Sequence, residues 1–508
     1  MLKTWLSEGF TKITGSEPGP DKSTCGISIY AAKSSSCSFQ ISFRSDADIS
    51  GLTLETDTDP EGIVSELFRV HMLDVKGEEW PDPLSPFLGN LCLPAGKTRS
   101  LYIRFSVGAE AKPGEYRRVF TLNTAAGKIL ETYTVNIRVW NFKLPDKPSM
   151  STALILDRKS IELVYGYIKD YHDPLPAEYR DETDEIYKYY YDYLLRNRIC
   201  PYILPYDILD DRADSYLDDK RVTTVYIPHK SDDDELKKIW YKLNRKPEWA
   251  AKAIIYPVDE PTSKEMLEEI REKTAHYRSI CPGIRCATSF FCNIDYDENT
   301  DEIGFLADNL DVLCFKQKCW FDPAMYSPEQ MKKYPPMKER TEELRRRGKT
   351  IWSYVCWEPR RPFANLLVDE PGIDHRVLFW QQFDVGAEGF LYWDVNYWEC
   401  LGGDPWSSMA TVPWLSDDVI GDGCLLYNGE KHGVKGPLPS KRFECVREGI
   451  EDYELLCIAK SAMGEEWIDK YIRCVTQDII TYTQDERTFA AIRAEIGNRL
   501  EEKLNENN

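Results

Sequence analysis

Two adjacent acidic residues, Asp259 and Glu260, close an apolar stretch at residues 254–258, and Pro261 follows them. Carboxyl groups act as general acids and bases, and two close together push their pKa values apart, so that one keeps its proton near neutral pH. Neighbouring strand residues point to opposite faces, so both acids reach one pocket only if the strand ends and curls there. We expect Pro261 to hold Glu260 extended. The same residues also fit an ordinary helix start, with Glu260 near the cap.

The spacing of this pair suggests a particular kind of glycoside hydrolysis. The usual mechanisms place two carboxyl groups on opposite sides of the scissile bond, about 5–9.5 Å apart, which adjacent residues cannot easily do. They suit the substrate-assisted variant, in which the sugar's own 2-acetamido oxygen attacks the anomeric carbon. One acid protonates the leaving oxygen, and its neighbour orients the acetamido N–H and stabilises the oxazolinium-like intermediate. The pair therefore predicts a 2-acetamido sugar as substrate.

Aromatic residues gather near the same part of the chain. The sequence contains 14 Trp, 30 Tyr and 19 Phe, and many of them lie between residues 352 and 406. Aromatic faces can stack on a pyranose ring while polar neighbours bond its hydroxyls, although half or more of these residues would serve a core equally well. The candidate substrate-binding residues are Asn293, Tyr354, Trp357, Tyr392, Trp393, Asn396, Trp398 and Trp406.

Eight short apolar runs alternate with helix-like segments over residues 148–410. This is the number expected of a (β/α)8 barrel of about 250 residues, in which catalytic groups collect at the carboxyl ends of the strands. Asp259 and Glu260 follow the fourth run. The expected strands are 153–156, 200–205, 223–227, 253–258, 285–291, 312–315, 351–355 and 390–393, and the expected helices are 178–197, 233–247, 262–279, 327–347 and 373–385.

The flanking regions have different patterns. Residues 1–147 are predicted to form a β-sandwich, because segments such as 133–139 alternate apolar and polar residues. Residues 411–508 begin as loops and continue as two helical stretches with apolar stripes, which indicates a helical extension packed on the barrel. The predicted fold is thus a multi-domain β plus α/β chain.

Composition disfavours several classes of protein. The 508 residues carry 64 basic and 85 acidic side chains, a net charge of −21 that disfavours binding to nucleic acid or to an anionic membrane. No apolar run is long enough to span a membrane, and no secretory signal is visible. The 15 Cys contain no CxxC pair, which is typical of free thiols in the cytoplasm. The six His have no metal-binding spacing, so we expect neither metal nor cofactor.

Several motifs together resemble glycoside hydrolase family 123. They are residues 256–261, 351–359, 389–398 and 404–406 around the acidic pair, 421–429, 439–442 and 447–453 in the tail, and 113–116 and 139–145 before the barrel. The resemblance implies a retaining exo-β-N-acetylgalactosaminidase acting on an oligosaccharide or glycoconjugate. It implies Glu260 as acid and base and Asp259 as the group that polarises the acetamide. It also implies a tyrosine that bonds the acetamido oxygen, for which Tyr354 and Tyr392 are candidates.

Two other functions stay open at this level. One is a glycan-binding protein on a hydrolase-like scaffold without turnover, and the other is a glycosidase for a different sugar, such as a β-N-acetylglucosaminide. The sequence leaves the linkage, the aglycone and the oligomeric state undetermined.

Overall fold

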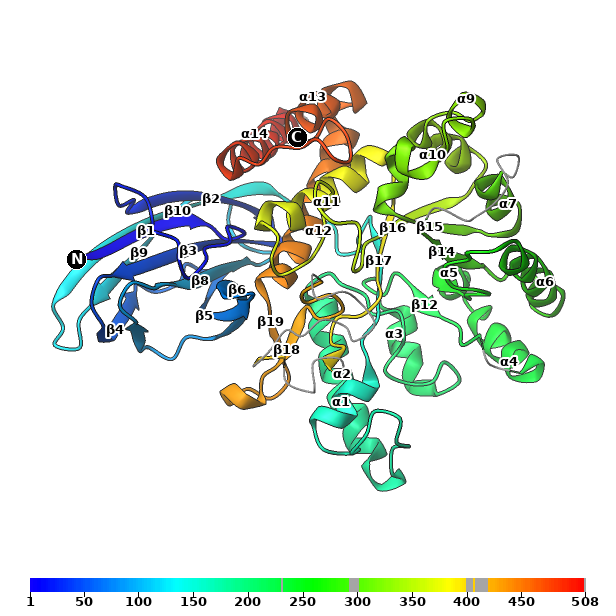
Figure 1. Cartoon of the computed structure of the whole chain (residues 1–508), viewed down its shortest axis with the longest axis horizontal. Coiled ribbons are helices and arrows are strands. Elements are labelled where there is room, and N and C mark those ends of the chain that lie inside the picture. Colours follow the sequence, from blue (N-terminus) through cyan, green and yellow to red (C-terminus); the bar gives the residue numbers. More distant parts are fainter. Residues whose placement is uncertain (230–231, 292–300, 399–404, 407–418, 507–508) are drawn as a thin grey trace.

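The computed structural model of the protein describes residues 1–229, 232–291, 301–398, 405–406 and 419–506. Strands fill the N-terminal part, parallel strands and helices fill the middle part, and helices close the chain (Figure 1). In these ranges, no helix has both the length and the apolar character needed to cross a membrane.

Ten strands in the first 143 residues form two sheets, in the orders β1-β3-β8-β5-β6 and β2-β10-β9-β4-β7. Neighbouring strands are antiparallel, except that β2 runs parallel to β10. The strands are β1 (Leu2–Glu8), β2 (Gly26–Lys33), β3 (Ser35–Ser45), β4 (Ile49–Thr56), β5 (Ile63–Val75), β6 (Glu78–Pro86), β7 (Leu91–Leu93), β8 (Thr98–Val107), β9 (Gly114–Asn123) and β10 (Ile129–Lys143).

The two sheets pack face to face around one core. In β10, Tyr133, Val135, Ile137 and Val139 are completely buried, as the alternating pattern predicts. They belong to the same apolar cluster as Phe39 of β3 in the opposite sheet. The β-rich N-terminal region expected from the sequence is therefore confirmed, and we refer to it as the N-terminal sheets.

Five parallel strands form a curled sheet in the middle region, in the order β11-β17-β16-β15-β14. Two short parallel strands, β12 (Val225–Tyr226) and β13 (Ala253–Ile254), form a separate pair. Single parallel bridges join Leu154 to Pro201 and Ile255 to Cys286. The sheet strands are β11 (Ser151–Leu154), β14 (Ala287–Phe290), β15 (Val312–Lys316), β16 (Thr350–Tyr354) and β17 (Gly389–Tyr392).

The expected strands are thus only partly formed in the described residues. The second expected strand contributes a single bridge at Pro201, and the fourth is shorter than residues 253–258. Proline has no amide hydrogen to donate to a strand ladder, and Pro201, Pro205 and Pro257 all lie in these two segments. The named strands make a curled half-barrel rather than eight continuous strands.

Most expected helices are present within a few residues of their predicted bounds. The stretch 327–347 divides in two at Pro335 and Pro336, because proline interrupts a helix. The helices are α1 (Arg158–Val164), α2 (Arg180–Arg196), α3 (Asp214–Asp218), α4 (Asp233–Leu243), α5 (Pro247–Lys252), α6 (Lys264–Ile280), α7 (Glu302–Asn309), α8 (Asp322–Met325), α9 (Gln330–Lys333), α10 (Met337–Arg346), α11 (Gly372–Val385), α12 (Lys441–Met463), α13 (Glu465–Val475) and α14 (Glu486–Glu506). Short 3-10 turns occur at Ala177–Tyr179, Asp211–Ala213, Gln317–Trp320 and Glu430–His432, and β18 (Leu426–Asn428) pairs with β19 (Pro437–Pro439).

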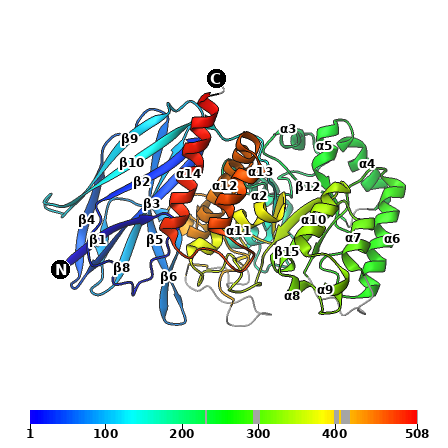
Figure 2. The same ribbon diagram turned by 90° about the horizontal axis from the view of Figure 1, so that it is seen from above.

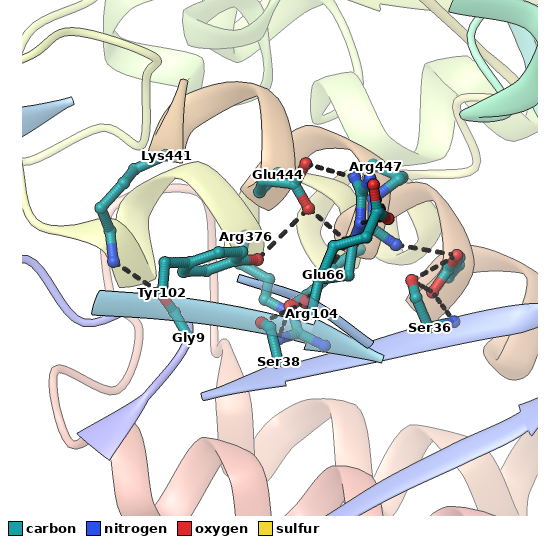
Figure 3. Close-up of polar contacts among 12 residues, drawn as sticks. Gly9, Ser36, Ser38, Glu66, Tyr102, Arg104, Arg376, Lys441, Glu444 and Arg447 are labelled. Carbon is teal, nitrogen blue, oxygen red and sulfur yellow. Dashed lines mark hydrogen bonds and ion pairs between the residues drawn. The ribbon is translucent and has the colours of Figure 1, made fainter. Parts of the chain in front are cut away.

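Helix α12 lies between the N-terminal sheets and the parallel strands (Figure 2). Its first four turns are buried on all sides although they contain many charged residues. Glu444 accepts hydrogen bonds from Tyr102 Oη at 3.2 Å, from Arg104 Nη1 at 2.7 Å and from Arg447 Nη2 at 2.6 Å (Figure 3). Such pairing offsets the cost of burying charge. We name as the interface cluster Ser36, Ser38, Glu66, Tyr102, Arg104, Arg376, Lys441, Glu444, Arg447, Glu448 and Glu451.

Further contacts of α12 fix the N-terminal sheets in place. Ser36 Oγ donates to Glu451 at 3.0 Å, and Lys441 Nζ donates to the Gly9 carbonyl at 2.6 Å (Figure 3). Arg442 forms a two-pronged ion pair with Asp82, at 2.9 and 2.8 Å, and both side chains are completely buried. Helix α12 therefore joins the N-terminal sheets to the rest of the molecule.

Candidate active site

The two acids lie just beyond the short strand β13. Glu260 has a φ angle of 41°, a left-handed conformation that costs a residue other than glycine about 1–3 kcal/mol. Pro261 therefore does not hold Glu260 extended, as the sequence led us to expect. Helix α6 begins only at Lys264 and is capped by Ser263, so the helix-start interpretation is wrong as well. The sharp turn explains how neighbouring acids avoid pointing to opposite sides.

Asp259 contacts the adjacent strand β14. Ser289 Oγ donates a short hydrogen bond to Asp259 Oδ1. Burial of the carboxyl group raises the pKa of Asp259 above its ordinary value and the charge of Glu260 raises it further, while the bond from Ser289 lowers it. Asp259 consequently holds a proton more readily than a free aspartate, and an additional donor brought by a ligand would favour its charged form.

Glu260 contacts the next two strands along the sheet. The hydroxyl of Tyr354, at the end of β16, donates a short hydrogen bond to Glu260 Oε1. Lys316 Nζ, at the end of β15, lies 3.5 Å from the same oxygen. Burial and the nearby Glu260 raise the pKa of Tyr354 well above its usual range, so Tyr354 stays an O–H donor at neutral pH. The side chain of Glu260 is 37% exposed, which leaves it accessible to a ligand.

Lys316 connects Glu260 to a second carboxylate. Its Nζ lies 3.2 Å from Glu358 Oε1, and Lys318 Nζ lies 2.8 Å from that same oxygen. Burial would lower the pKa of Lys316, but the nearby Glu260 and Glu358 contribute to raising it, so the ammonium stays charged. We call Asp259, Glu260, Ser289, Lys316, Tyr354 and Glu358 the carboxylate site.

Of the two candidate tyrosines, Tyr354 contacts Glu260, whereas Tyr392 lies on the opposite face of the sheet. Across the sheet Tyr354 pairs with Leu391, so Tyr392, one residue further, points to the opposite face. The Tyr392 hydroxyl donates to Asp422 Oδ1 at 3.0 Å, and Tyr392 is completely buried. Burial raises the pKa of Asp422 to about 6.

Two tryptophans of the predicted aromatic wall have a face near the inner side of the sheet. The ring of Trp357, 38% exposed, has Lys316 Nζ 5.4 Å from its centre. Trp393 is partly buried, belongs to the apolar cluster on the inner face with Tyr354, and lies 5.1 Å from the ring of Tyr397. Both rings remain candidates for contact with a sugar.

Three other predicted residues make contacts within the protein. Asn396 is completely buried and bonds both the amide and the carbonyl of Asp157, at 2.7 and 2.9 Å. Trp398 is completely buried and donates to the Leu426 carbonyl at 2.9 Å. Trp406 donates to the Asn428 carbonyl at 2.9 Å and packs against His71 and His432. Asn293 lies outside the described residues.

Sequence reasoning missed Ser289 as a partner of the acids. Residues two apart on a strand share a face, and Ala287 of the same strand belongs to the inner-face cluster. The position of Ser289 at the end of an expected strand was the available signal, but the sequence does not show which face of that strand is the inner one. Lys316, Trp357 and Glu358 all follow expected strands, but nothing in the sequence indicated which of them contacts Glu260.

A pair of carboxyl groups at the ends of parallel strands is compatible with the acid–base chemistry of a glycoside hydrolase. The comparisons agree, because residues 190–459 match the catalytic domain of glycoside hydrolase family 123. The match covers more than half of the chain, and the protein belongs to that family.

Among solved structures, a family 123 glycoside hydrolase from Clostridium perfringens, studied for glycolipid glycan hydrolysis, has the same fold. It is 12% identical, with a TM-score of 0.70 over 100% of this chain and 98% of that one. A calcium-binding mutant of Bacteroides uniformis beta-glucuronidase 2 is far less similar, with a TM-score of 0.25 at 12% identity over 91% of this chain and 50% of that one. No curated protein matches the sequence.

Proposed function

We propose that this glycoside hydrolase is a retaining exo-glycosidase that releases β-linked N-acetylgalactosamine by substrate-assisted catalysis. Glu260 is the acid and base, and Asp259 orients the acetamido group. The observation that carries the proposal is the turn at Glu260, which directs two adjacent carboxyl groups to different partners on one sheet: Asp259 to Ser289, and Glu260 to Tyr354 and Lys316.

In the first step the acetamido oxygen attacks the anomeric carbon. The bond from that carbon to the leaving oxygen breaks, and Glu260 gives its proton to the leaving oxygen. In the second step water attacks the same carbon, Glu260 takes a proton from the water, and the bond to the acetamido oxygen breaks. Two inversions give net retention. One exposed carboxyl group thus serves both steps, as microscopic reversibility requires.

Asp259 acts on the acetamido nitrogen. An N–H that donates to Asp259 favours the carboxylate, whose charge then stabilises the positive oxazolinium. The pKa of Asp259 is raised in the free protein. The carboxylate form is therefore lost, as pH falls, at a higher pH than for an ordinary aspartate, and the acid limb of the kcat/KM profile lies correspondingly high.

The ligand-facing side chains in this proposal are fewer than the sequence suggested. Tyr354 supplies a hydroxyl beside Glu260, which makes it the better candidate for the acetamido oxygen. Trp357 and Trp393 supply aromatic faces. We leave out Tyr392, Asn396, Trp398 and Trp406, because their polar atoms bond to protein groups outside the carboxylate site.

We also propose that the parallel strands complete a (β/α)8 barrel, with domain boundaries near residues 147 and 410. Backbone hydrogen bonds between the short strands and their neighbours support this. They run from Leu154 N to Cys200 O at 3.3 Å, from Tyr226 N to Tyr202 O at 2.7 Å, from Ile227 N to Ile254 O at 2.8 Å and from Ala287 N to Ile255 O at 3.0 Å.

Chromogenic β-N-acetylgalactosaminide and β-N-acetylglucosaminide test the substrate, and proton NMR of the first product tests retention. We expect release from the first sugar with the β-anomer formed first, and strong inhibition by its thiazoline derivative, which resembles the oxazolinium. Binding without release would favour the glycan-binding alternative. Release from a sugar that lacks the 2-acetamido group would overturn the substrate-assisted mechanism.

The natural substrate class follows from the same proposal. The Clostridium perfringens relative was studied for hydrolysis of glycolipid glycans, and we propose glycans of that kind for this protein. Thin-layer analysis of products from neutral glycolipids with a terminal β-N-acetylgalactosamine, beside soluble oligosaccharides with the same end, measures the preference.

A further inference from the structure

Lys316 is placed to act on the acid without touching the substrate. Its side chain has no exposed surface, whereas Glu260 beside it is 37% exposed. The ammonium lies among three aromatic rings, with ring centres 4.7 Å away in Phe291, 5.2 Å in Tyr354 and 5.4 Å in Trp357. These rings exclude water and stabilise the cation through their faces. A ligand that reaches Glu260 is therefore separated from Lys316 by protein.

The groups that face Glu260 come from several elements. Asp259 belongs to the same turn, Cys314 and Lys316 to β15, and Tyr354 and Cys356 to β16 and the residue pair that follows it. Burial raises the pKa of Cys356 to about 12 and that of Cys314 well above its ordinary value, so both thiols are neutral. Among these neighbours, Lys316 supplies the positive charge.

The charge of Lys316 is divided between two carboxylates. Nζ lies 3.5 Å from Glu260 Oε1 and 3.2 Å from Glu358 Oε1, and Glu358 is held in turn by Lys318 at 2.8 Å. An undivided cation at this distance would lower the pKa of a carboxyl group by about 1–3 units. Glu358 takes part of that attraction away from Glu260.

We propose that Lys316 is a positioning residue for the acid–base step, and that its ammonium, shared between Glu260 and Glu358, sets the pH at which Glu260 loses its proton. The inference rests on the proposed role of Glu260. The acid must be protonated for the first step and ionised for the second.

The alkaline limb of the kcat/KM profile tests this, with a chromogenic β-N-acetylgalactosaminide as probe. Lys316→Met removes the cation and keeps the side-chain volume, so Glu260 keeps its proton to higher pH and the limb moves up by about one unit. Glu358→Gln leaves Lys316 to Glu260 alone, so the limb moves down. The matched control is Lys318→Met, which removes a lysine that contacts Glu358 but makes no contact with Glu260; its shift should be less than half that of Lys316→Met.

A second readout does not depend on turnover. Carboxyl 13C NMR of protein labelled at glutamate, with the Glu260 resonance assigned by its loss in Glu260→Gln, follows the same titration directly. A Glu260 midpoint that does not move in Lys316→Met, or that moves equally in Lys318→Met, overturns the proposal. Wild-type protein that releases no sugar, yet shows the expected NMR shifts, would overturn the proposed function and leave the charge-sharing intact. If Lys316→Met does not fold, Glu358→Gln decides.

Discussion

The interface cluster and the carboxylate site contain the same types of side chain but differ in their burial and in their pairing. In the interface cluster, Glu444 is buried and accepts hydrogen bonds from a tyrosine and two arginines. At the carboxylate site, Glu260 also accepts from a tyrosine and lies beside a lysine, but it is partly exposed and adjacent to a second acid. The types of residue around a glutamate therefore do not show whether it stabilises the fold or is a candidate for catalysis.

The difference lies in how completely each carboxylate is compensated. Arg104 and Arg447 outweigh burial and hold the pKa of Glu444 below its ordinary value, so it stays ionised. At Asp259, burial together with Glu260 outweighs the hydrogen bond from Ser289 and the charge of Lys316, so the pKa of Asp259 is raised. A buried carboxylate whose charge is fully offset by arginines, such as Glu444, rigidifies the fold. A carboxyl group whose charge is only partly offset, such as Asp259, can accept a further hydrogen bond from a ligand.

Removing the acid should give the largest effect on activity. We expect Glu260→Gln to lower kcat/KM by about 10²–10⁴-fold, because no proton is delivered to the leaving oxygen. Steady-state kinetics on the chromogenic substrate measures this, and the thermal unfolding curve should stay close to that of the wild type. The control is Glu265→Gln, an exposed neighbour on α6, which should retain activity. Undiminished activity in Glu260→Gln would refute the assignment.

A substitution in the interface cluster should lower the stability of the protein and leave the pH profile of its activity unchanged. Arg447→Met leaves Glu444 and Glu451 without an arginine that lies 2.6 and 3.2 Å from them. Breaking a buried pair costs about 3–5 kcal/mol, so the free energy of unfolding in urea should fall by that amount. The pH profile of kcat/KM at a temperature where the variant is folded should not change. Arg499→Met, which removes an exposed pair on α14, is the control and should change stability little; equal losses in both would contradict the contrast.

Trp357 should affect binding more than chemistry. Replacing its exposed ring by alanine removes a stacking face, so KM should rise about two- to tenfold with a smaller change in kcat. Trp398→Phe, at a completely buried ring, should instead lower the unfolding temperature and leave KM unchanged. Identical KM values for wild type and Trp357→Ala would remove Trp357 from the proposed binding surface.

The smallest expected effect concerns Ser289. Ser289→Ala removes a donor that stabilises charged Asp259, so the pKa of Asp259 rises. The reactive carboxylate is then lost at a higher pH as pH falls, and the acid limb of the kcat/KM profile moves up by about half a pH unit. Ser353→Ala, a buried serine on the other face of β16, should leave that limb in place. A limb that moves down, or moves in both variants, would contradict the assignment.

Many helices and strands could be predicted from the spacing of apolar residues along the sequence. The alternation in residues 133–139 predicted the buried face of β10, and most helix positions followed from apolar spacing. The acidic pair was found because it ends an apolar run. The short strands were overestimated because Pro201, Pro205 and Pro257 offer no amide hydrogen to a strand ladder, in segments whose composition is otherwise typical of strands.

Contacts between strands could not be predicted in the same way. Tyr354 and Tyr392 both end an apolar run, and only the register that pairs Tyr354 with Leu391 shows that they face opposite sides. The charged residues of α12 suggest a solvated helix when read alone, and only the packing of the N-terminal sheets reveals that Glu444 and Arg447 are buried. Register and long-range packing depend on the whole fold rather than on neighbouring residues.

The backbone at Glu260 is strained at the same residue that carries the proposed acid. A φ angle of 41° suits glycine better than any other residue. Glu260→Gly would relieve the backbone strain, but it would also delete the carboxyl group that accepts from Tyr354 and pairs with Lys316. Under the proposed role of Glu260, the strained turn and the reactive carboxyl group belong to the same residue, so the chain cannot relieve the first without losing the second.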